Sequence, residues 1–262
     1  MDLGIRGRKA IVNGGSAGMG KGSVRALAHE GCELFVSARG EDRLLAACEE
    51  ITKETGASIT PIVADHSSDE GREKILAACP EPDILVGTCA PPPTTGDYRH
   101  VSDDEWEATL SVALMSPVNF MKAIVPGMAD RGWGRIVNIG TGAAKHPAEI
   151  RILSGPPRAA LVNYSVAVAR SVAKHNVSIN NILPGMYHTA SIHDRFTAQA
   201  AANGTSYDEE VSNFVKEWRI PAEKFGNPDD LGTFVAMFCS EQANFLVGQS
   251  LVIDGGIGNT TF

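Results

Sequence analysis

Short runs of apolar, β-branched residues alternate with longer segments of helical periodicity from the start of the chain. Continuous apolar strands separated by helices are typical of a parallel sheet that is buried on both faces. The pattern predicts strands at residues 9–13, 33–38, 58–64, 83–88, 135–139, 178–183 and 250–253. It predicts helices between them, including 18–30, 41–55, 69–79 and one long helix over 102–131. We therefore expect a single-domain α/β fold over residues 1–262, a Rossmann-type doubly wound parallel sheet of about seven strands with helices on both faces.

One stretch fits this alternation less well. Residues 186–220 are rich in Ala, Thr, Asn and Ser and lie between a strand and a turn. A substrate loop that acts as a lid and a plain pair of surface helices both agree with this composition, and both stay open.

Composition narrows the class of partner. The formal net charge is −8 and no long Lys/Arg run is present, so we expect neither nucleic acid nor a membrane surface as a partner. The five cysteines are scattered and form no C-x-x-C pair, which favours buried thiols in a reducing compartment over disulfides or a metal site. The first residues contain no apolar signal core, and we recognise no stretch of about 18 apolar residues. We expect a cytoplasmic protein with a small-molecule substrate.

The first predicted strand runs directly into a glycine-rich turn that opens a helix. Glycines allow the backbone to approach a pyrophosphate, and a helix N-terminus supplies free N–H groups and the positive end of its dipole. At the first strand–helix turn of such a sheet, this pattern favours a dinucleotide over a plain tight turn. The expected contacts are Gly14, Ser16, Ala17, Gly18, Met19 and Gly20.

The end of the second strand indicates which dinucleotide binds. In a nicotinamide-binding fold, an acidic residue at this point suits NAD, whereas a nearby arginine suits the 2′-phosphate of NADP. The strand ends in Ala38-Arg39 and has no acid, so we expect NADP, with NAD less favoured. A solvated arginine at a helix start is the alternative for Arg39.

Together these residues resemble the short-chain dehydrogenase/reductase family, over nearly the whole chain. Gly14-x3-Gly18-x-Gly20 is similar to the family's glycine motif, although Asn13 stands where Thr is usual. Residues 134–139 resemble its fifth strand, and 253–256 resemble its last strand and turn. The resemblance implies an assembly of two or four subunits, a homodimer or homotetramer. It also implies cofactor contacts from Asp65, His66, Cys89, Ala90, Arg158, Pro184, Gly185 and Thr189.

The catalytic signature departs from the family's pattern. The family uses Ser, Tyr and Lys, with Tyr as the general acid/base and Lys lowering its pKa and holding the ribose. The resemblance places Thr141, Ser154 and Arg158 at these three positions, and Ala113 at the position of a helical Asn. A threonine hydroxyl still donates a hydrogen bond, and an arginine keeps its charge but cannot release a proton. A serine hydroxyl is too weak an acid to replace the tyrosine near neutral pH.

Two prolines make a structural role for Ser154 the preferred interpretation. Pro156-Pro157 belong in the first turn of a helix, so the helix should begin near Pro156. Ser154 or Gly155 is then the N-cap residue, and capping is preferred to catalysis for Ser154.

Other groups are candidates for the missing acid. Lys145 follows the fifth strand at the carboxyl edge of the sheet, and a partly desolvated lysine can act near pH 7. Its alternative is an exposed loop lysine. Further candidates on the substrate side are Tyr187, His188, His193 and Asp194. A metal site built from the two histidines lacks helical i, i+4 spacing. Tyr164 is expected to pack in the core.

These observations predict an NADP-dependent oxidoreductase that acts on a small carbonyl or alcohol substrate. In this hypothesis Thr141 holds the carbonyl oxygen, and Arg158 holds the ribose or a substrate carboxylate. A non-redox enzyme, such as a C–C lyase, a dehydratase or a dehalogenase, is the first alternative. Halohydrin dehalogenases also replace the Lys by Arg, although they keep the Tyr and lose the glycine loop. A binding protein that senses NADP without turnover is the second alternative.

Overall fold

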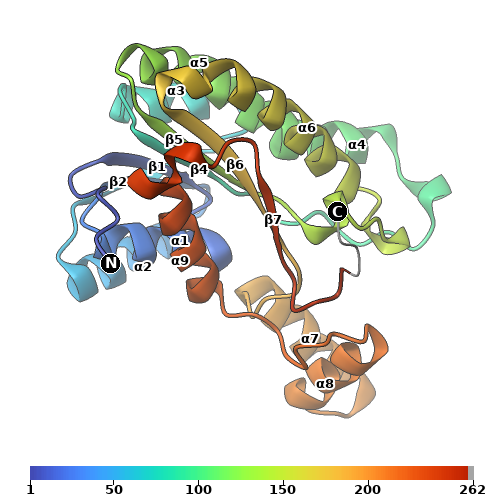
Figure 1. The fold of residues 1–262 in the computed structure, drawn as a ribbon. Coiled ribbons are helices and arrows are strands. Elements are labelled where there is room, and N and C mark those ends of the chain that lie inside the picture. Colours follow the sequence, from blue (N-terminus) through green and yellow to red (C-terminus); the bar gives the residue numbers. More distant parts are fainter. Residues whose placement is uncertain (259–262) are drawn as a thin grey trace.

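The computed structural model, which describes residues 1–258, contains a seven-stranded parallel sheet (Figure 1). The strands follow the order β3-β2-β1-β4-β5-β6-β7, and every neighbouring pair is parallel. Their bounds are β1 Lys9–Asn13, β2 Glu33–Ala38, β3 Ile59–Val63, β4 Ile84–Gly87, β5 Gly134–Ile139, β6 Val177–Pro184 and β7 Ser250–Ile253. The reversal of strand order between β1 and β4 confirms the expected doubly wound α/β sheet. Ligands bind at such a reversal, outside the carboxyl ends of the strands.

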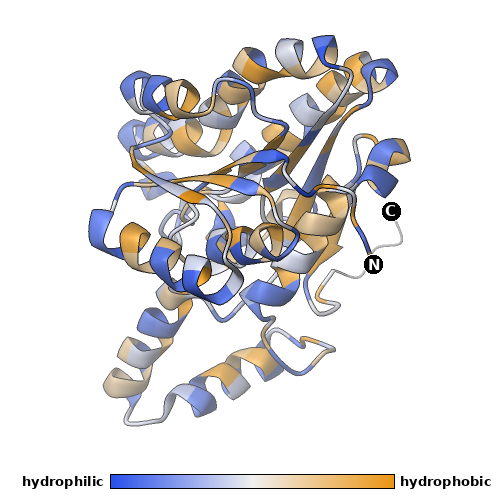
Figure 2. Cartoon of the chain, turned by 90° about the vertical axis from the view of Figure 1, so that its left-hand side faces the viewer, coloured by the Kyte–Doolittle hydropathy of each residue, from blue (hydrophilic) through white to orange (hydrophobic). Residues whose placement is uncertain are grey.

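Helices cover both faces of the sheet (Figure 1). One face packs against α1 (Gly18–His29), α2 (Glu41–Thr55) and α9 (Pro228–Cys239). The other packs against α3 (Asp69–Ala78), α5 (Ser116–Asp130) and α6 (Gly155–Val172). Figure 2 shows hydrophobic residues concentrated along the central strands, whereas the helices are mixed, as expected for a sheet buried between two helical layers.

The long helix expected over 102–131 is interrupted. It consists of α4 (Asp103–Leu110), a π-helical turn (Ser111–Met115) and α5. Pro117 lies in the first turn of α5 and has no N–H to donate to the carbonyl of Ala113. A wider π turn accommodates this missing bond, and such turns are frequent at functional sites.

The same segment is apolar enough to pass for a membrane span by length and hydropathy, contrary to our sequence-based expectation. Its side chains Phe120, Ile124 and Met128 are buried in the core against the sheet. A core helix meets the same criteria of length and hydropathy as a spanning helix, so this segment is weak evidence for a membrane span.

The stretch at 186–220 contains a helical hairpin that projects from the sheet (Figure 1). Helices α7 (Ala190–Asn203) and α8 (Tyr207–Glu217) share a small hydrophobic cluster centred on Phe196 and Phe214. Buried Glu210 accepts hydrogen bonds from Gln199, Asn203 and Thr205, which ties the two helices together. The hairpin is therefore a folded unit with a core of its own.

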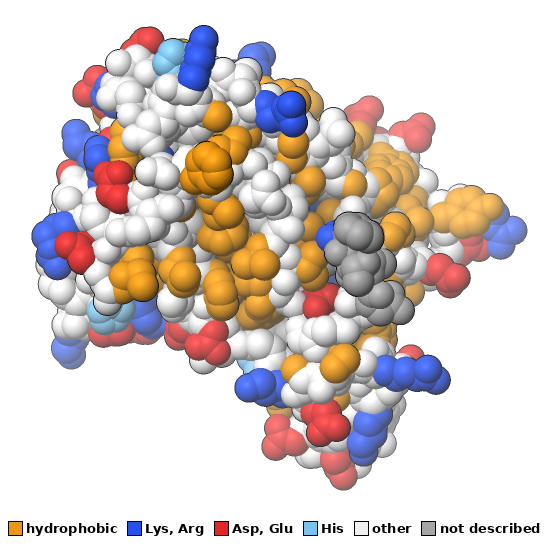
Figure 3. Space-filling view, viewed as in Figure 1, with side chains coloured by type: hydrophobic (Ala, Val, Ile, Leu, Met, Phe, Trp, Pro, Cys, Tyr) orange, Lys and Arg blue, Asp and Glu red, His pale blue; other side chains and the backbone are white. Residues whose placement is uncertain are grey.

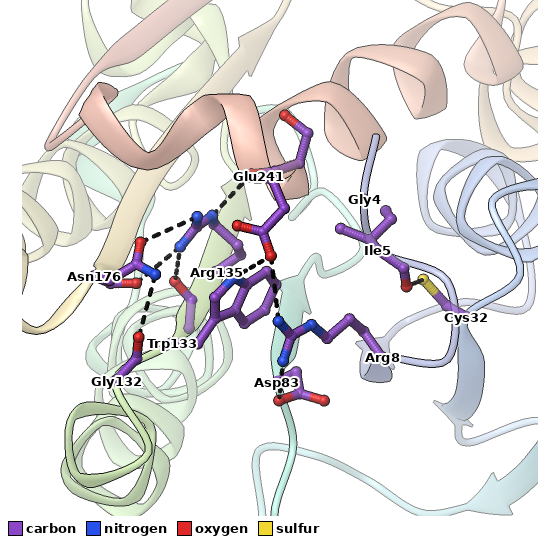
Figure 4. Close-up of polar contacts among 12 residues, drawn as sticks. Gly4, Ile5, Arg8, Cys32, Asp83, Gly132, Trp133, Arg135, Asn176 and Glu241 are labelled. Atoms are coloured by element: carbon purple, nitrogen blue, oxygen red, sulfur yellow. Dashed lines mark hydrogen bonds and ion pairs between the residues drawn. The ribbon is translucent and has the colours of Figure 1, made fainter. Parts of the chain in front are cut away.

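A polar network closes the amino-terminal edge of the sheet (Figure 4). The Trp133 ring lies between two guanidinium groups, 3.9 Å from the Cζ of Arg8 and 4.5 Å from that of Arg135. Trp133 Nε1 donates to Glu241 at 2.9 Å. Arg135 is fully buried and donates to the carbonyl oxygens of Ser240, Gly134 and Asn176. This network fixes the start of β5, at the opposite end of the strand from the candidate site.

Candidate active site

The turn after β1 has the shape of an anion cradle. Gly14 and Gly18 adopt positive φ angles of 73° and 52°. A Cβ on Gly20 would clash with the carbonyl oxygen of Gly14, so the turn requires glycine there. The N-cap residue of α1, Ala17, offers no side-chain acceptor, which leaves the first N–H groups of the helix available to a ligand. A pyrophosphate fits this arrangement.

The segment after β6 lies across this cradle. The Cγ2 atom of Thr189 is 3.0 Å from where a Cβ on Gly18 would stand. Thr189 also caps α7, because its Oγ1 accepts from the N–H of Ile192 at 3.4 Å. Buried Pro184 ends β6, and Gly185 packs against Asp254. The hairpin thus begins directly at the edge of the glycine turn.

Arg39 and Asp65 lie together beyond β2 and β3. The Arg39 side chain is 73% exposed, with Nη1 4.0 Å from the carboxylate of Asp65. Burial raises the pKa of Asp65, but hydrogen bonds from Ser67 and the charge of Arg39 outweigh it, so the pKa is lowered overall. The exposed guanidinium is free to turn toward a phosphate.

The ring of His66 points into the protein. Its Nδ1 lies 2.7 Å from the Oγ of Ser116 on α5, and burial lowers its pKa. Together they line a small cavity of about 20 Å³ beneath the carboxyl ends of β1, β4 and β5. Asn138 also lines this cavity, and its buried Oδ1 has no hydrogen-bond partner within residues 1–258.

The carboxyl ends of β4 and β5 meet the start of α6. Arg158 is 4% exposed, and its guanidinium donates to the carbonyl oxygen of Ser154 at 3.2 Å. It also donates to Cys89 Sγ at 3.0 Å and to the carbonyl oxygen of Ala90 at 3.5 Å. The Cβ of Arg158 lies close to Gly140, which precedes Thr141. The structure therefore brings three sequence-predicted residues, Cys89, Ala90 and Ser154, into contact with a fourth, Arg158. Thr141 is not among these contacts, and its Oγ1 accepts from the N–H of Ala143 at 3.4 Å.

Ser154 occupies the N-cap position of α6, but its side chain does not cap the helix. The helix begins at Gly155, one residue before the expected Pro156, and Ser154 forms no side-chain cap bond. Its backbone is in the helical region, with φ −93° and ψ −48°, rather than the extended conformation of a capping serine. The expectation of a capping side chain is wrong. The Ser154 hydroxyl instead faces Arg158, 3.4 Å from Nη1.

The candidate replacement acids are not gathered at this point. Lys145 is exposed and its side chain has no hydrogen bond within residues 1–258. Tyr187 is buried and donates to the carbonyl oxygen of Ile253, and burial raises its pKa to about 12. His188 is exposed and contacts the hydroxyl of Tyr207 at 2.9 Å. Tyr164 packs in the core, as expected. The described residues contain no group of three or more potential metal ligands.

Sequence reasoning missed one contact and two residues. The contact between Arg158 and Cys89 joins residues 69 positions apart. Asn138 lies within a strand whose apolar pattern predicts core, and its Oδ1 has no partner within residues 1–258, although its Nδ2 donates to Ser165 and Asn181. Half-buried Arg151 stands in a short helical turn (Glu149–Arg151) directly before α6. No local motif distinguishes any of them, because their significance depends on tertiary neighbours.

Comparison with known proteins adds an independent observation. A family model described as enoyl-(acyl carrier protein) reductase matches residues 14–258. The chain belongs to the short-chain dehydrogenase/reductase family. The match extends from the glycine turn to the segment after β7, and so includes every part of the site described above.

Individual members of this family are similar along their whole length. The uncharacterised oxidoreductase YvaG of Bacillus subtilis (strain 168) is 26% identical over an alignment of 268 positions, which covers 100% of both chains. Dehydrogenase/reductase SDR family member 4 of Homo sapiens is 27% identical over 256 residues, 96% of this chain and 88% of that one. The crystal structure of L-sorbose reductase from Gluconobacter frateurii, complexed with NADPH and L-sorbose, superposes with a TM-score of 0.94 at 27% identity, covering 99% and 100% of the two chains.

Proposed function

We propose that this protein is an NADP-dependent oxidoreductase that interconverts a small carbonyl compound and the matching alcohol. The observation that carries the proposal is the pairing of two features at one edge of the sheet. One is the glycine cradle with Arg39 beyond it, and the other is the contact of Arg158 with Ser154, with Thr141 two residues after the end of β5. The NADPH complex of the similar L-sorbose reductase supports the choice of cofactor.

In this proposal the chain's own residues bind, orient and polarise the substrate. Gly14, Gly18 and the first turn of α1 hold the pyrophosphate, while Arg39 holds the 2′-phosphate. When bound, the nicotinamide supplies or accepts the hydride. The hydroxyl of Thr141 donates to the substrate oxygen, and the positive charge of Arg158 stabilises the negative charge that develops there.

Arg158 cannot release the proton that the alcohol oxygen gains, because a guanidinium group does not give up a proton in proteins. Lys145 is exposed and Tyr187 is engaged elsewhere, so we assign proton delivery to solvent water. The site proposed here is therefore an atypical one, in which a serine and an arginine stand where the family has its Tyr and Lys.

We also propose that the α7–α8 hairpin serves as the substrate lid. It begins at Thr189, which lies against Gly18 of the cradle, so a displacement of α7 alters the wall of the site. Its own core, centred on Phe196 and Phe214, allows it to move as a unit.

Purified protein, NADPH and a panel of small aldehydes and ketones test the proposal. We expect the absorbance at 340 nm to fall as a matching amount of alcohol forms. Substrate conversion without any change at 340 nm would indicate the non-redox alternative. Tight NADPH binding, with no product from any compound, would instead indicate a binding protein.

Arg39→Ser should weaken the binding of NADPH but not that of NADH. Loss of a charge-assisted hydrogen bond to the 2′-phosphate should raise the KM for NADPH about 10-fold, since such a bond contributes about 1.5–3 kcal/mol. The KM for NADH should change little, because NADH has no phosphate there. Arg43→Ser, which removes an exposed arginine from the next turn, is the matched control. Equal rises for the two cofactors would contradict the role of Arg39.

An oligomer is proposed from the exposed apolar surface near the chain's end. Phe234, Met237 and Phe245 are 38%, 47% and 96% exposed, and Figure 3 shows hydrophobic side chains gathered over α9 and β7. Contiguous exposed apolar surface of this kind marks an interface. Sedimentation analysis should find a dimer or tetramer, and Met237→Glu with Phe245→Glu should shift it to smaller species. Leu45→Glu, on exposed α2 surface, should not. A monomeric wild type would refute the assembly.

A further inference from the structure

Three arginines in the segments that follow β5 and β6 have no acidic partners. They are Arg151 in the turn before α6, Arg158 in α6 and Arg195 in α7. No carboxylate within residues 1–258 lies within 4.0 Å of any of them, whereas Arg8, Arg25 and other arginines form ion pairs. The other arginines without such pairs, apart from Arg135 in its carbonyl network, are exposed to solvent. The three differ from these because they are half-buried or, for Arg158, buried.

Arg151 and Arg195 have side-chain N–H donors that are not used in hydrogen bonds to oxygen within residues 1–258. The side chain of Arg151 makes a single polar contact within the described chain, from Nη2 to the Sδ of Met186 at 3.9 Å, and a thioether is a weak acceptor. Arg195 lies with its Cζ 4.9 Å from the ring of Phe196 and has no side-chain hydrogen bond within residues 1–258. By contrast, Arg158 is occupied by Ser154, Cys89 and Ala90.

The charges of Arg195 and Arg158 oppose that of Arg151. Burial lowers the pKa of Arg151, and the like charges of Arg195 and Arg158 lower it further. The positive end of the α6 dipole adds to them, since no acidic residue occupies the first turn of that helix. Partly desolvated cations that repel one another cost free energy unless an anion binds between them.

The cofactor does not account for this charge. Its pyrophosphate fits the glycine turn after β1, and its 2′-phosphate fits Arg39 after β2, on the other half of the sheet. Arg151 and Arg195 come from the segments after β5 and β6, where the substrate would lie. Arg151 belongs to the body of the protein and Arg195 to the hairpin. Met186, which Arg151 contacts, lies in the segment that leads into the hairpin.

We infer that Arg151 and Arg195 bind an anionic group of the substrate, so that the substrate is a small carbonyl compound, or its alcohol, that carries a carboxylate or a phosphate. The inference rests on the proposed function and specifies its substrate class. Planar guanidinium groups bind such oxyanions through paired hydrogen bonds. Anchoring by Arg195 draws α7 of the hairpin toward the body, so only a charged substrate closes the site fully.

Matched substrate pairs test this inference. The pairs are 2-oxo and 3-oxo acids against their methyl esters, and dihydroxyacetone phosphate against dihydroxyacetone, each assayed with NADPH at pH 7. We expect kcat/KM to be about 100-fold higher for the charged member, as two charge-assisted hydrogen bonds would give. The oxo acids and the phosphate ester show which anion is used. Preference for the neutral member of every pair would overturn the inference.

Charge-removing variants locate the effect. Arg151→Gln and Arg195→Gln should each lower kcat/KM for the charged substrate about 10-fold, chiefly through KM, and leave the neutral partner unchanged. Arg170→Gln, which removes an exposed and equally unpaired arginine from the end of α6, should change neither. An unaltered ratio of charged to neutral substrate in both site variants would overturn the assignment.

Melting of the NADP⁺-loaded protein separates this inference from the proposed function. If no compound is reduced, the proposed function fails, but the ligand site is still measurable. The same acids or phosphate ester should raise the Tm of the wild type and not that of Arg151→Gln. The absence of any shift in the wild type would overturn the anion site.

Discussion

Arg158→Met should lower kcat/KM by about 100-fold or more while the protein remains folded. The variant removes a buried positive charge and replaces it with an apolar chain of similar length. Loss of one preorganised donor to a developing oxyanion costs about 10²–10³-fold in rate, and Arg158 adds a full charge to its hydrogen bonds. Initial rates with NADPH and the best substrate measure the effect, and NADPH affinity and Tm report on cofactor binding and folding.

Two further variants separate charge from geometry. Arg158→Lys keeps the charge but has no planar fork to contact Ser154, Cys89 and Ala90 together, so it should recover about 10-fold of the loss. Ser154→Ala removes only a hydroxyl 3.4 Å from Nη1 and should cost only a few-fold. If Arg158→Met retained wild-type kcat/KM, or if Ser154→Ala were the more damaging change, Arg158 would not be the group that stabilises charge.

Most of the fold could be predicted from the sequence because its signals are local. All seven strands appear where apolar runs are bounded by helical segments, with β3 and β4 shorter than expected by one residue at each end. The prediction of one continuous helix over 102–131 was wrong at the π-helical turn. Pro117 could have indicated this turn, because its missing N–H disrupts the helix one turn earlier.

The candidate site also has parts that could be predicted from local sequence and parts that could not. The glycine turn could be predicted because glycine is required by the backbone itself, as at Gly18 with its positive φ. The behaviour of Ser154 could not, because it depends on where the side chain of Arg158 turns after folding. Arg151 and Arg195 are ordinary arginines in the sequence, and only packing reveals that they lack partners.

Arg135→Met should lower the free energy of unfolding by about 3 kcal/mol. Arg135 is fully buried, with 0% of its surface exposed. Its guanidinium donates at 3.0, 2.9 and 2.8 Å to three carbonyl oxygens. Methionine fills part of the space but removes the guanidinium donors from all three carbonyl oxygens, although that of Asn176 still accepts from the N–H of Gly134. Each group left unsatisfied costs about 1–3 kcal/mol, offset by the arginine's own desolvation. Chemical denaturation of wild type and variant measures the difference.

Arg8→Met is the matched control, because Arg8 covers the other face of Trp133 but its side chain is 31% exposed. Its partners Asp83 and Glu241 can be hydrated when it is removed, so it should cost less than about 1 kcal/mol. NADPH affinity of the folded Arg135→Met protein should be unchanged, since the network lies at the amino-terminal edge of the sheet and the glycine cradle at the other. Equal losses of stability for the two variants would mean that burial of the carbonyl acceptors does not decide the cost. Weakened NADPH binding would mean that the amino-terminal and carboxyl-terminal edges of the sheet are coupled.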